Sequence, residues 1–162
     1  MWSCDRRTFL LSAVALGGCG FTPVYGPNGV GRSLQGMIEI ESPADTNTYN
    51  LVSFLEQRLG RGANAKFGLT YALSTRDEGL AVTESQTIVR YNVIGELSFA
   101  LRDLASTNVV SSGTVTALAA YSASGTTIAT QAARKDANER LMVALADRLI
   151  DRLYITLPSG AA

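Results

Sequence analysis

The chain has 162 residues, and none of them is histidine. This absence excludes Ser-His-Asp and Cys-His catalysis, imidazole zinc sites and the usual general base near neutral pH. Paired carboxylates or a lysine could still support catalysis, but the acidic residues are scattered and Lys66 and Lys135 are the only lysines. We therefore expect no catalytic residue, no metal site and no enzymatic activity.

No hydrophobic run is long enough to span a membrane. The apolar stretch Phe9–Leu16 covers about eight residues, whereas a membrane-spanning helix needs roughly 20. Two arginines precede it, and Gly17-Gly18-Cys19 follows it. This pattern is typical of a bacterial lipoprotein signal peptide. We predict that residues 1–18 are removed by cleavage between Gly18 and Cys19, and that the Cys19 thiol carries a diacylglycerol. A buried structural cysteine after an ordinary signal peptide is the alternative.

Cysteine is equally scarce. Cys4 lies in the predicted signal peptide, and Cys19 is predicted to be the lipid attachment site. No thiol then remains for a disulfide or a thiolate metal site. We expect no cofactor besides the acyl lipid, so the domain must be stable through its apolar core. The pair Arg6-Arg7 also fits twin-arginine export, and the sequence leaves that route and the general secretory route open.

Neither sign of charge is in excess. The chain carries 14 basic and 14 acidic side chains, and removing Arg6, Arg7 and Asp5 with the signal leaves 12 and 13. This balance argues against nucleic acid as a partner. The segment 19–35, rich in glycine and proline, is predicted to be a lipidated tether. Residues 36–158 are predicted to form one domain, and residues 159–162 a frayed C-terminus.

Within this domain, alternation of apolar residues predicts four strands. A Gly inside the third one, Gly95, suggests a bulge or bend there. The predicted strands are Met37–Glu41, Phe67–Ser74, Val89–Arg102 and Val109–Tyr121.

Two amphipathic helices are also predicted. The first follows Pro43, is capped by Asp45, Thr46 or Thr48, and ends at Gly60. The second runs roughly from Ala129 to Tyr154, with a leucine at every fourth position from Leu141 to Leu153. The order is therefore β-α-β-β-β-α. It predicts an α+β two-layer sandwich, in which both helices pack on one face of a mostly antiparallel sheet of about four strands.

This order of elements, together with two sequence segments, resembles the LptE family of lipopolysaccharide (LPS) assembly lipoproteins. The first segment is Cys19-Gly20-Phe21-Thr22-Pro23-Val24-Tyr25, at the predicted mature start. The second is Ala132–Leu141 followed by Leu145–Leu149, which is similar to the C-terminal helix of that family. The resemblance covers nearly all of the predicted mature chain.

The resemblance implies a function that composition and spacing do not reveal. It implies a lipid anchor on the periplasmic side of the outer membrane. It also implies partnership with the β-barrel LPS translocon LptD, whose lumen the protein plugs and whose assembly it assists, and contact with LPS. The alternative is an auxiliary periplasmic lipoprotein of a lipid-trafficking ABC transporter.

Contact with LPS requires cations that can meet the phosphates of lipid A, and arginine has the better geometry for this. The candidates on the predicted sheet or its loops are Arg90, Arg102, Arg61 and Lys66. The alternative is that they are ordinary solubilising charges. The last predicted strand, Val109–Tyr121, has uncharged polar side chains that would suit either the lumen of a barrel or ordinary solvent. They are Ser111, Ser112, Thr114 and Thr116.

Overall fold

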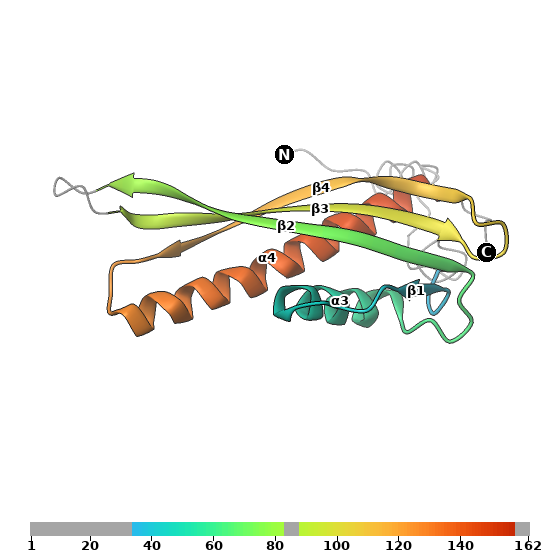
Figure 1. Cartoon of the computed structure of the whole chain (residues 1–162), viewed down its shortest axis with the longest axis horizontal. Coiled ribbons are helices and arrows are strands. Elements are labelled where there is room, and N and C mark those ends of the chain that lie inside the picture. The colour runs from blue at the N-terminus through green and yellow to red at the C-terminus, as the bar shows by residue number, and fades with distance from the viewer. Residues whose placement is uncertain (1–33, 83–87, 158–162) are drawn as a thin grey trace, which may run out of the picture.

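The computed structural model describes residues 34–82 and 88–157 (Figure 1). The predicted signal peptide, the lipid site Cys19 with its cleavage partner Gly18, and the predicted frayed end 159–162 lie outside these residues. The described elements follow the predicted order. They are β1 (Ile38–Ile40), α3 (Thr46–Leu59), β2 (Phe67–Val82), β3 (Ile88–Asp103), β4 (Val109–Ser122) and α4 (Thr127–Thr156).

The four strands form one sheet in the order β1-β2-β3-β4. The short β1 pairs in parallel with the start of β2, and the two remaining pairings are antiparallel. The sheet is therefore mixed, in agreement with the mostly antiparallel prediction. Since β1 reaches only from Phe67 to Leu69 on β2, the rest of that edge of β2 has no neighbouring strand among the residues that the structure describes.

Both helices cover the same face of the sheet, so the predicted two-layer α+β sandwich is confirmed (Figure 1). The long helix α4 crosses obliquely beneath the sheet, and α3 packs beside α4 and next to β1. Burial of apolar side chains between these layers stabilises the fold, because isolated helices are marginal in water. The fully buried large residues include Leu51, Leu55, Leu69, Leu97, Leu101, Leu141, Leu145 and Leu149.

The ends of α3 are fixed by the predicted residue types. The Asp45 carboxylate accepts a 2.7 Å hydrogen bond from the Thr48 N–H, and Thr48 Oγ1 accepts one from the Asp45 N–H. This capping box satisfies two backbone donors at the start of the helix. At the other end Gly60 has a φ of 76° and donates to the Glu56 carbonyl, as a glycine helix stop should.

Strand β2 is twice as long as the predicted Phe67–Ser74, because it continues to Val82. The stretch Arg76-Asp77-Glu78 looks like a polar turn, but each of its residues pairs with β3. Asp77 points toward the helix layer and forms an ion pair with Arg134 of α4. This pairing neutralises a charge that would otherwise favour a loop.

The predicted bulge at Gly95 and the outward position of Ser111 were wrong. Pairing runs regularly through Gly95 on both sides, and the irregularity in that part of the sheet lies between Leu101 and Arg102. Ser111 does not belong to the exposed polar face. It is only 7% exposed, and its hydroxyl lies 2.9 Å from Thr156 Oγ1 of α4. Its small side chain fits where the helix end meets the sheet.

The second helix is slightly longer than predicted, beginning at Thr127 after the cap Thr126. Of the two oppositely charged i, i+4 pairs in its sequence, Asp136–Arg140 forms an ion pair at 2.9 Å. A Lys135–Glu139 pair is not among the ion pairs of the described residues. Within residues 34–82 and 88–157, no helix is both long and apolar enough to cross a bilayer.

Candidate functional site

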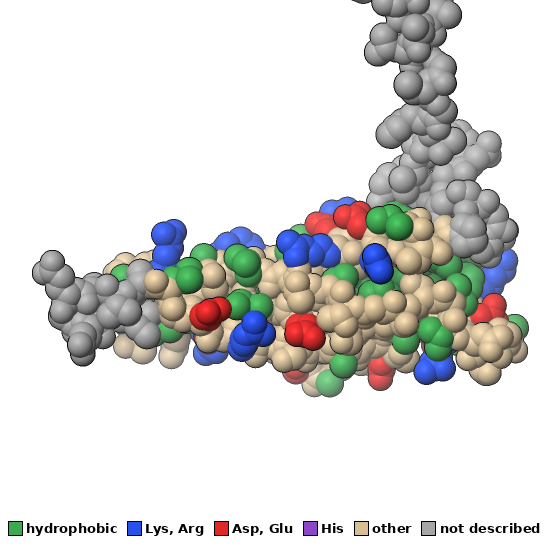
Figure 2. Space-filling model, turned by 90° about the horizontal axis from the view of Figure 1, so that it is seen from above, with side chains coloured by type: hydrophobic (Ala, Val, Ile, Leu, Met, Phe, Trp, Pro, Cys, Tyr) green, Lys and Arg blue, Asp and Glu red, His purple; other side chains and the backbone are tan. Residues whose placement is uncertain are grey.

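One face of the sheet carries no helix and is open among the residues that the structure describes. Figure 2 looks onto this side and shows charged groups of both signs scattered among uncharged ones. The outward positions of β4 are small and uncharged in the main, and Ser98 of β3 shares a 3.1 Å hydrogen bond with Thr114. The outward charges lie on β2 and β3, at Arg76, Glu78, Arg90, Glu96 and Arg102. The face therefore mixes charges of both signs, uncharged polar side chains and exposed apolar ones such as Val110 and Leu118, without one dominant sign of charge.

The cations predicted to meet LPS are divided between the two ends of the sheet. Arg102, at the end of β3, pairs in register with Gly68, and Lys66 immediately precedes β2. Arg61 lies in the loop that joins α3 to β2 at the same end. Arg90 lies near the start of β3, about 40 Å away along the strand at about 3.4 Å per residue. The structure therefore brings three of the four to one end and separates Arg90 from them.

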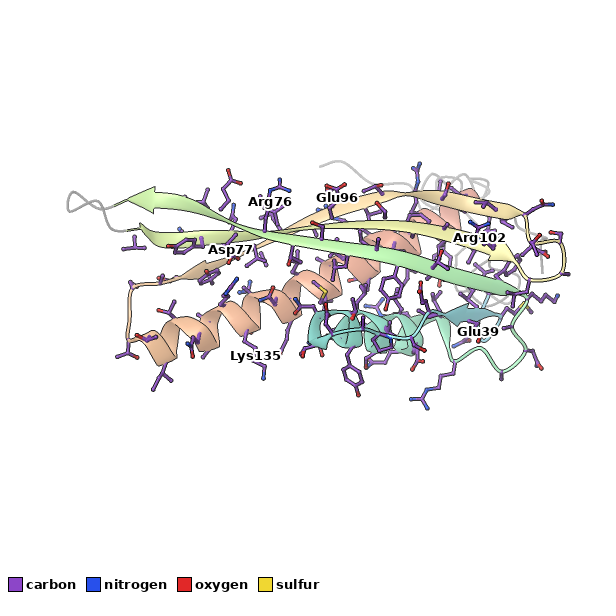
Figure 3. The ribbon with its side chains drawn as sticks, in the orientation of Figure 1. Glu39, Arg76, Asp77, Glu96, Arg102 and Lys135 are labelled. Carbon is purple, nitrogen blue, oxygen red and sulfur yellow. The ribbon has the colours of Figure 1, made fainter. Side chains whose placement is uncertain are left out.

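A hollow of about 340 Å³ lies beside Arg102. Glu39, Gly68 and Arg102 occupy neighbouring register positions on β1, β2 and β3, so the glycine leaves a gap between the two charged side chains. Leu104 packs over that gap, since a Cβ on Gly68 would lie 3.1 Å from its Cδ2. Figure 3 shows Glu39 and Arg102 at this end of the sheet. The Arg102 guanidinium could bind an anionic group that also contacts the apolar wall, although the carboxylates of Glu39 and Glu41 line the same hollow and give it charges of both signs.

The other three cations have different surroundings. Arg90 lines a second hollow with Val89, Ser122 and Ser124. The Arg61 Nε lies 3.1 Å from Glu56 Oε2, and its side chain is 87% exposed, as an ordinary surface charge would be. Lys66 is exposed and lines neither hollow. Arg90 and Arg102 are therefore the better placed candidates for an anionic ligand.

A polar cleft with a volume of about 380 Å³ lies between α3 and α4 and was not predicted from the sequence. Its two walls are polar stripes at helical spacing, Asn47 and Asn50 on α3 and three residues of α4. This spacing was visible in the sequence and could have indicated a shared polar groove. The α4 residues are Gln131, Lys135 and Asn138, with Arg134 and Glu139 beside them.

The far end of the sheet holds a second feature that the sequence did not reveal. The rings of Tyr91 and Tyr121 stack with their centroids 5.3 Å apart on the helix side of β3 and β4. Burial raises the pKa of the Tyr121 hydroxyl, and the nearby Asp77 carboxylate raises it further. Together with the Asp77–Arg134 ion pair, this cluster attaches the first half of α4 to the sheet.

None of these features forms a catalytic or metal-binding constellation. No group of three or more potential metal ligands occurs among residues 34–82 and 88–157. The arrangement offers flat polar surface, two arginine-lined hollows and an interhelical cleft. Such surfaces are suited to binding.

Comparison with known proteins gives the family. The model of the LptE family, described as lipopolysaccharide-assembly, matches residues 37–153. A search of curated proteins found no significant match.

Several solved structures share the fold. A protein of Caulobacter crescentus described as a lipoprotein has a TM-score of 0.62 and 21% identity, covering 76% of this chain and 92% of its own. The rare lipoprotein B of Shewanella oneidensis has a TM-score of 0.56 and 14% identity, covering 74% and 92%. A minor lipoprotein of Acinetobacter baumannii has a TM-score of 0.54 and 15% identity, covering 73% and 91%. At these identities the likeness shows a common fold.

Proposed function

Because the chain belongs to the LptE family of lipopolysaccharide-assembly proteins, we propose that it is the lipoprotein partner of an LptD-like β-barrel. In this proposal it plugs the barrel lumen, assists assembly of the barrel and thereby supports insertion of LPS into the outer leaflet. Its role in LPS assembly follows from the family. Partnership with the barrel is what we propose beyond that family role. The family is one of accessory lipoproteins, so we assign the chain no catalytic activity.

The polar sheet face with interspersed charges is the observation that carries this proposal. The interior of a large barrel is polar, so a plug needs a surface that is polar without a strong field of one sign. The outward positions of β4, Ser112, Thr114 and Thr116, carry no charge, and the charges on β2 and β3 are of both signs. The elongated body in Figure 1, with its long axis along the strands, is a suitable shape for a lumen.

Membrane attachment is proposed to depend on Cys19, the first residue of the predicted mature chain. Acylation there would hold the domain on the periplasmic side of the outer membrane, joined to it by the segment 19–35. Each buried CH₂ of an acyl chain contributes about 0.8 kcal/mol, and stable anchoring needs at least two chains. A diacylglycerol meets that requirement.

Contact with LPS is proposed at the two arginine-lined hollows. Arg102 has an apolar wall in Leu104, and Arg90 has hydroxyl neighbours in Ser122 and Ser124. Guanidinium groups bind phosphate oxygens in a bidentate manner, so either site is suited to a lipid A phosphate. Lys66 and Arg61 would add positive charge near the Arg102 hollow.

The direct test is to recover the acylated chain, with a C-terminal tag, from outer membranes solubilised in mild detergent. We expect an LptD-sized barrel to co-purify in near-equal amount. Since the proposed interface is mostly uncharged, a high-salt wash should remove little of it. Recovery of ABC-transporter components in place of the barrel would support the alternative function and contradict this one.

A further inference from the structure

The two edges of the sheet differ in how they resist pairing with another chain. The edge of β2 is covered by β1 at its start, and beyond that it carries Arg76, Glu78 and the inward-pointing Asp77. Charged residues on an edge strand, and inward-pointing charges in particular, are means by which proteins prevent strand addition. The Glu41 carboxylate also accepts a 3.4 Å hydrogen bond from the Tyr71 N–H. Only Leu73 and Thr75 therefore have outward backbone groups between the covered start and the charged end of this edge, so it is mostly protected.

The opposite edge, β4, has no such protection. Its 14 residues, Val109–Ser122, include no charged residue and no proline. It is the last strand of the sheet order, so one side of its backbone has no neighbouring strand among the described residues. A long uncharged edge strand is a template for pairing with another extended segment.

Two hydrogen bonds show which backbone groups of β4 point outward. The Ala123 N–H donates to the Val89 carbonyl at 2.9 Å, so residues in phase with Ala123 bond to β3. Ala120 has the opposite phase, and its carbonyl instead accepts a 3.1 Å bond from Arg140 Nη2 of α4. Residues in phase with Ala120 therefore direct their N–H and C=O groups away from the sheet.

The outward backbone groups that are open for pairing occupy only part of β4, which is limited at both ends. Arg140 covers one end at Ala120, and the irregular pairing near Val109 ends the other. Between these limits, no hydrogen bond within residues 34–82 and 88–157 reaches the outward backbone groups. The residues that carry these groups all have exposed side chains, and they are Ser112, Thr114, Thr116 and Leu118.

We propose that the Ser112–Leu118 segment of β4 binds an extended, uncharged segment of the barrel partner, which adds to the sheet as a fifth strand. This inference rests on the proposed function. Only an extended backbone supplies donors and acceptors at the spacing of the outward groups. The added segment comes from a part of the partner outside the closed wall, because strands within the wall already use both edges. It is uncharged because the edge offers no opposite charge.

The inference can be tested by removing one outward N–H of β4 while keeping all the backbone hydrogen bonds between β4 and β3. Thr116→Pro in the full acylated chain deletes that donor, and proline is tolerated on an edge strand whose N–H faces outward. We expect a roughly tenfold or larger fall in the barrel recovered, since strand addition loses a hydrogen bond and meets the proline ring. Thr116→Ala keeps the N–H and should recover as much barrel as the wild type.

A matched control uses the protected edge. Backbone groups along β2 point alternately toward β3 and away from it, and the Tyr71 N–H points away, toward Glu41. Thr75 lies four residues further on, so its N–H also points away from the sheet. Thr75→Pro is the same chemical change at the other edge and should leave barrel recovery unchanged. Thermal unfolding of each variant checks the fold, and Thr114→Pro replaces Thr116→Pro if the latter does not fold.

The outcomes separate this inference from the proposed function. Full barrel recovery by a folded Thr116→Pro variant would overturn the inference and leave the proposed function standing. Absence of the barrel from the wild-type preparation would overturn both. If the purified wild-type chain is a dimer that Thr116→Pro converts to a monomer, the edge pairs with a second copy, and the inference is wrong.

Discussion

Gly95 of β3 lies directly against Leu145 of α4. A Cβ added at Gly95 would be 2.9 Å from Leu145 Cδ1 and 3.1 Å from Leu141 Cδ2. The absence of a side chain at Gly95 therefore lets the helix approach the centre of the sheet closely. Leu145 fills that space and is fully buried, so the packing of the two layers depends on this contact.

Leu145→Ala should destabilise the domain by about 2–5 kcal/mol, because it removes buried apolar atoms and leaves a cavity over Gly95. The measurement is the free energy of unfolding in denaturant. Ser112→Ala is the control, since Ser112 is exposed on the opposite face of the sheet and should change little. Equal losses for the two variants would contradict the two-layer arrangement.

The order of elements and the core were predictable because they depend on local patterns. Alternation predicted the apolar side of β3, and the leucine repeat predicted the buried stripe of α4. The full extent of β2 was not predictable, since Asp77 is neutralised by Arg134, which is far away in the sequence. The burial of Ser111 depends in the same way on Thr156.

The candidate site was predictable only in part. Residue type singled out Arg90 and Arg102, but only the strand register shows that they lie at opposite ends, each beside a hollow. The open edge of β4 depends on the order of strands in the sheet and on the cap from Arg140. Neither is encoded by a local pattern.

Asp45→Ala should lower stability by about 1 kcal/mol at neutral pH through loss of the helix cap. The hydrogen bond from the Thr48 N–H lowers the pKa of the Asp45 carboxyl. A lowered pKa means that this contribution is present above the unfolded-state pKa and is lost as the pH falls through the folded-state value. The difference between wild type and variant should therefore shrink below about pH 4.

Unfolding curves from pH 7 to pH 3 measure this effect. Asp45→Asn is the control, because asparagine also caps helices but does not titrate in this range. It should keep most of the stability at pH 7. A stability difference between wild type and Asp45→Ala that stays constant down to pH 3 would show that the ionised carboxylate contributes nothing to the cap.

Cys19→Ser should abolish acylation and release the protein from membranes, since a serine hydroxyl does not form the thioether. The measurement combines metabolic labelling with a fatty acid and sedimentation of membranes after a high-salt wash. The experiment is done in cells lacking the barrel partner, which could otherwise retain the protein. Continued sedimentation of the unlabelled variant under these conditions would rule out the lipid as the anchor.

Charge reversal at Arg102 or Arg90 should weaken LPS binding without altering the fold, because both side chains are exposed and line hollows. The change should be at least several-fold, since loss of a charge-assisted hydrogen bond is worth about 1.5–3 kcal/mol. Arg61→Glu is the comparison, because Arg61 is already paired with Glu56 and should matter less. Normal LPS binding by both reversals would remove these arginines from the site.

The most direct test of the central claim is depletion of this protein in its own cells, followed by measurement of correctly assembled LPS translocon in the outer membrane. The account predicts that the amount of folded barrel falls and that the outer surface becomes permeable to large hydrophobic compounds. Re-expression of the wild-type chain should restore both. Unchanged translocon levels together with an intact permeability barrier would contradict the account.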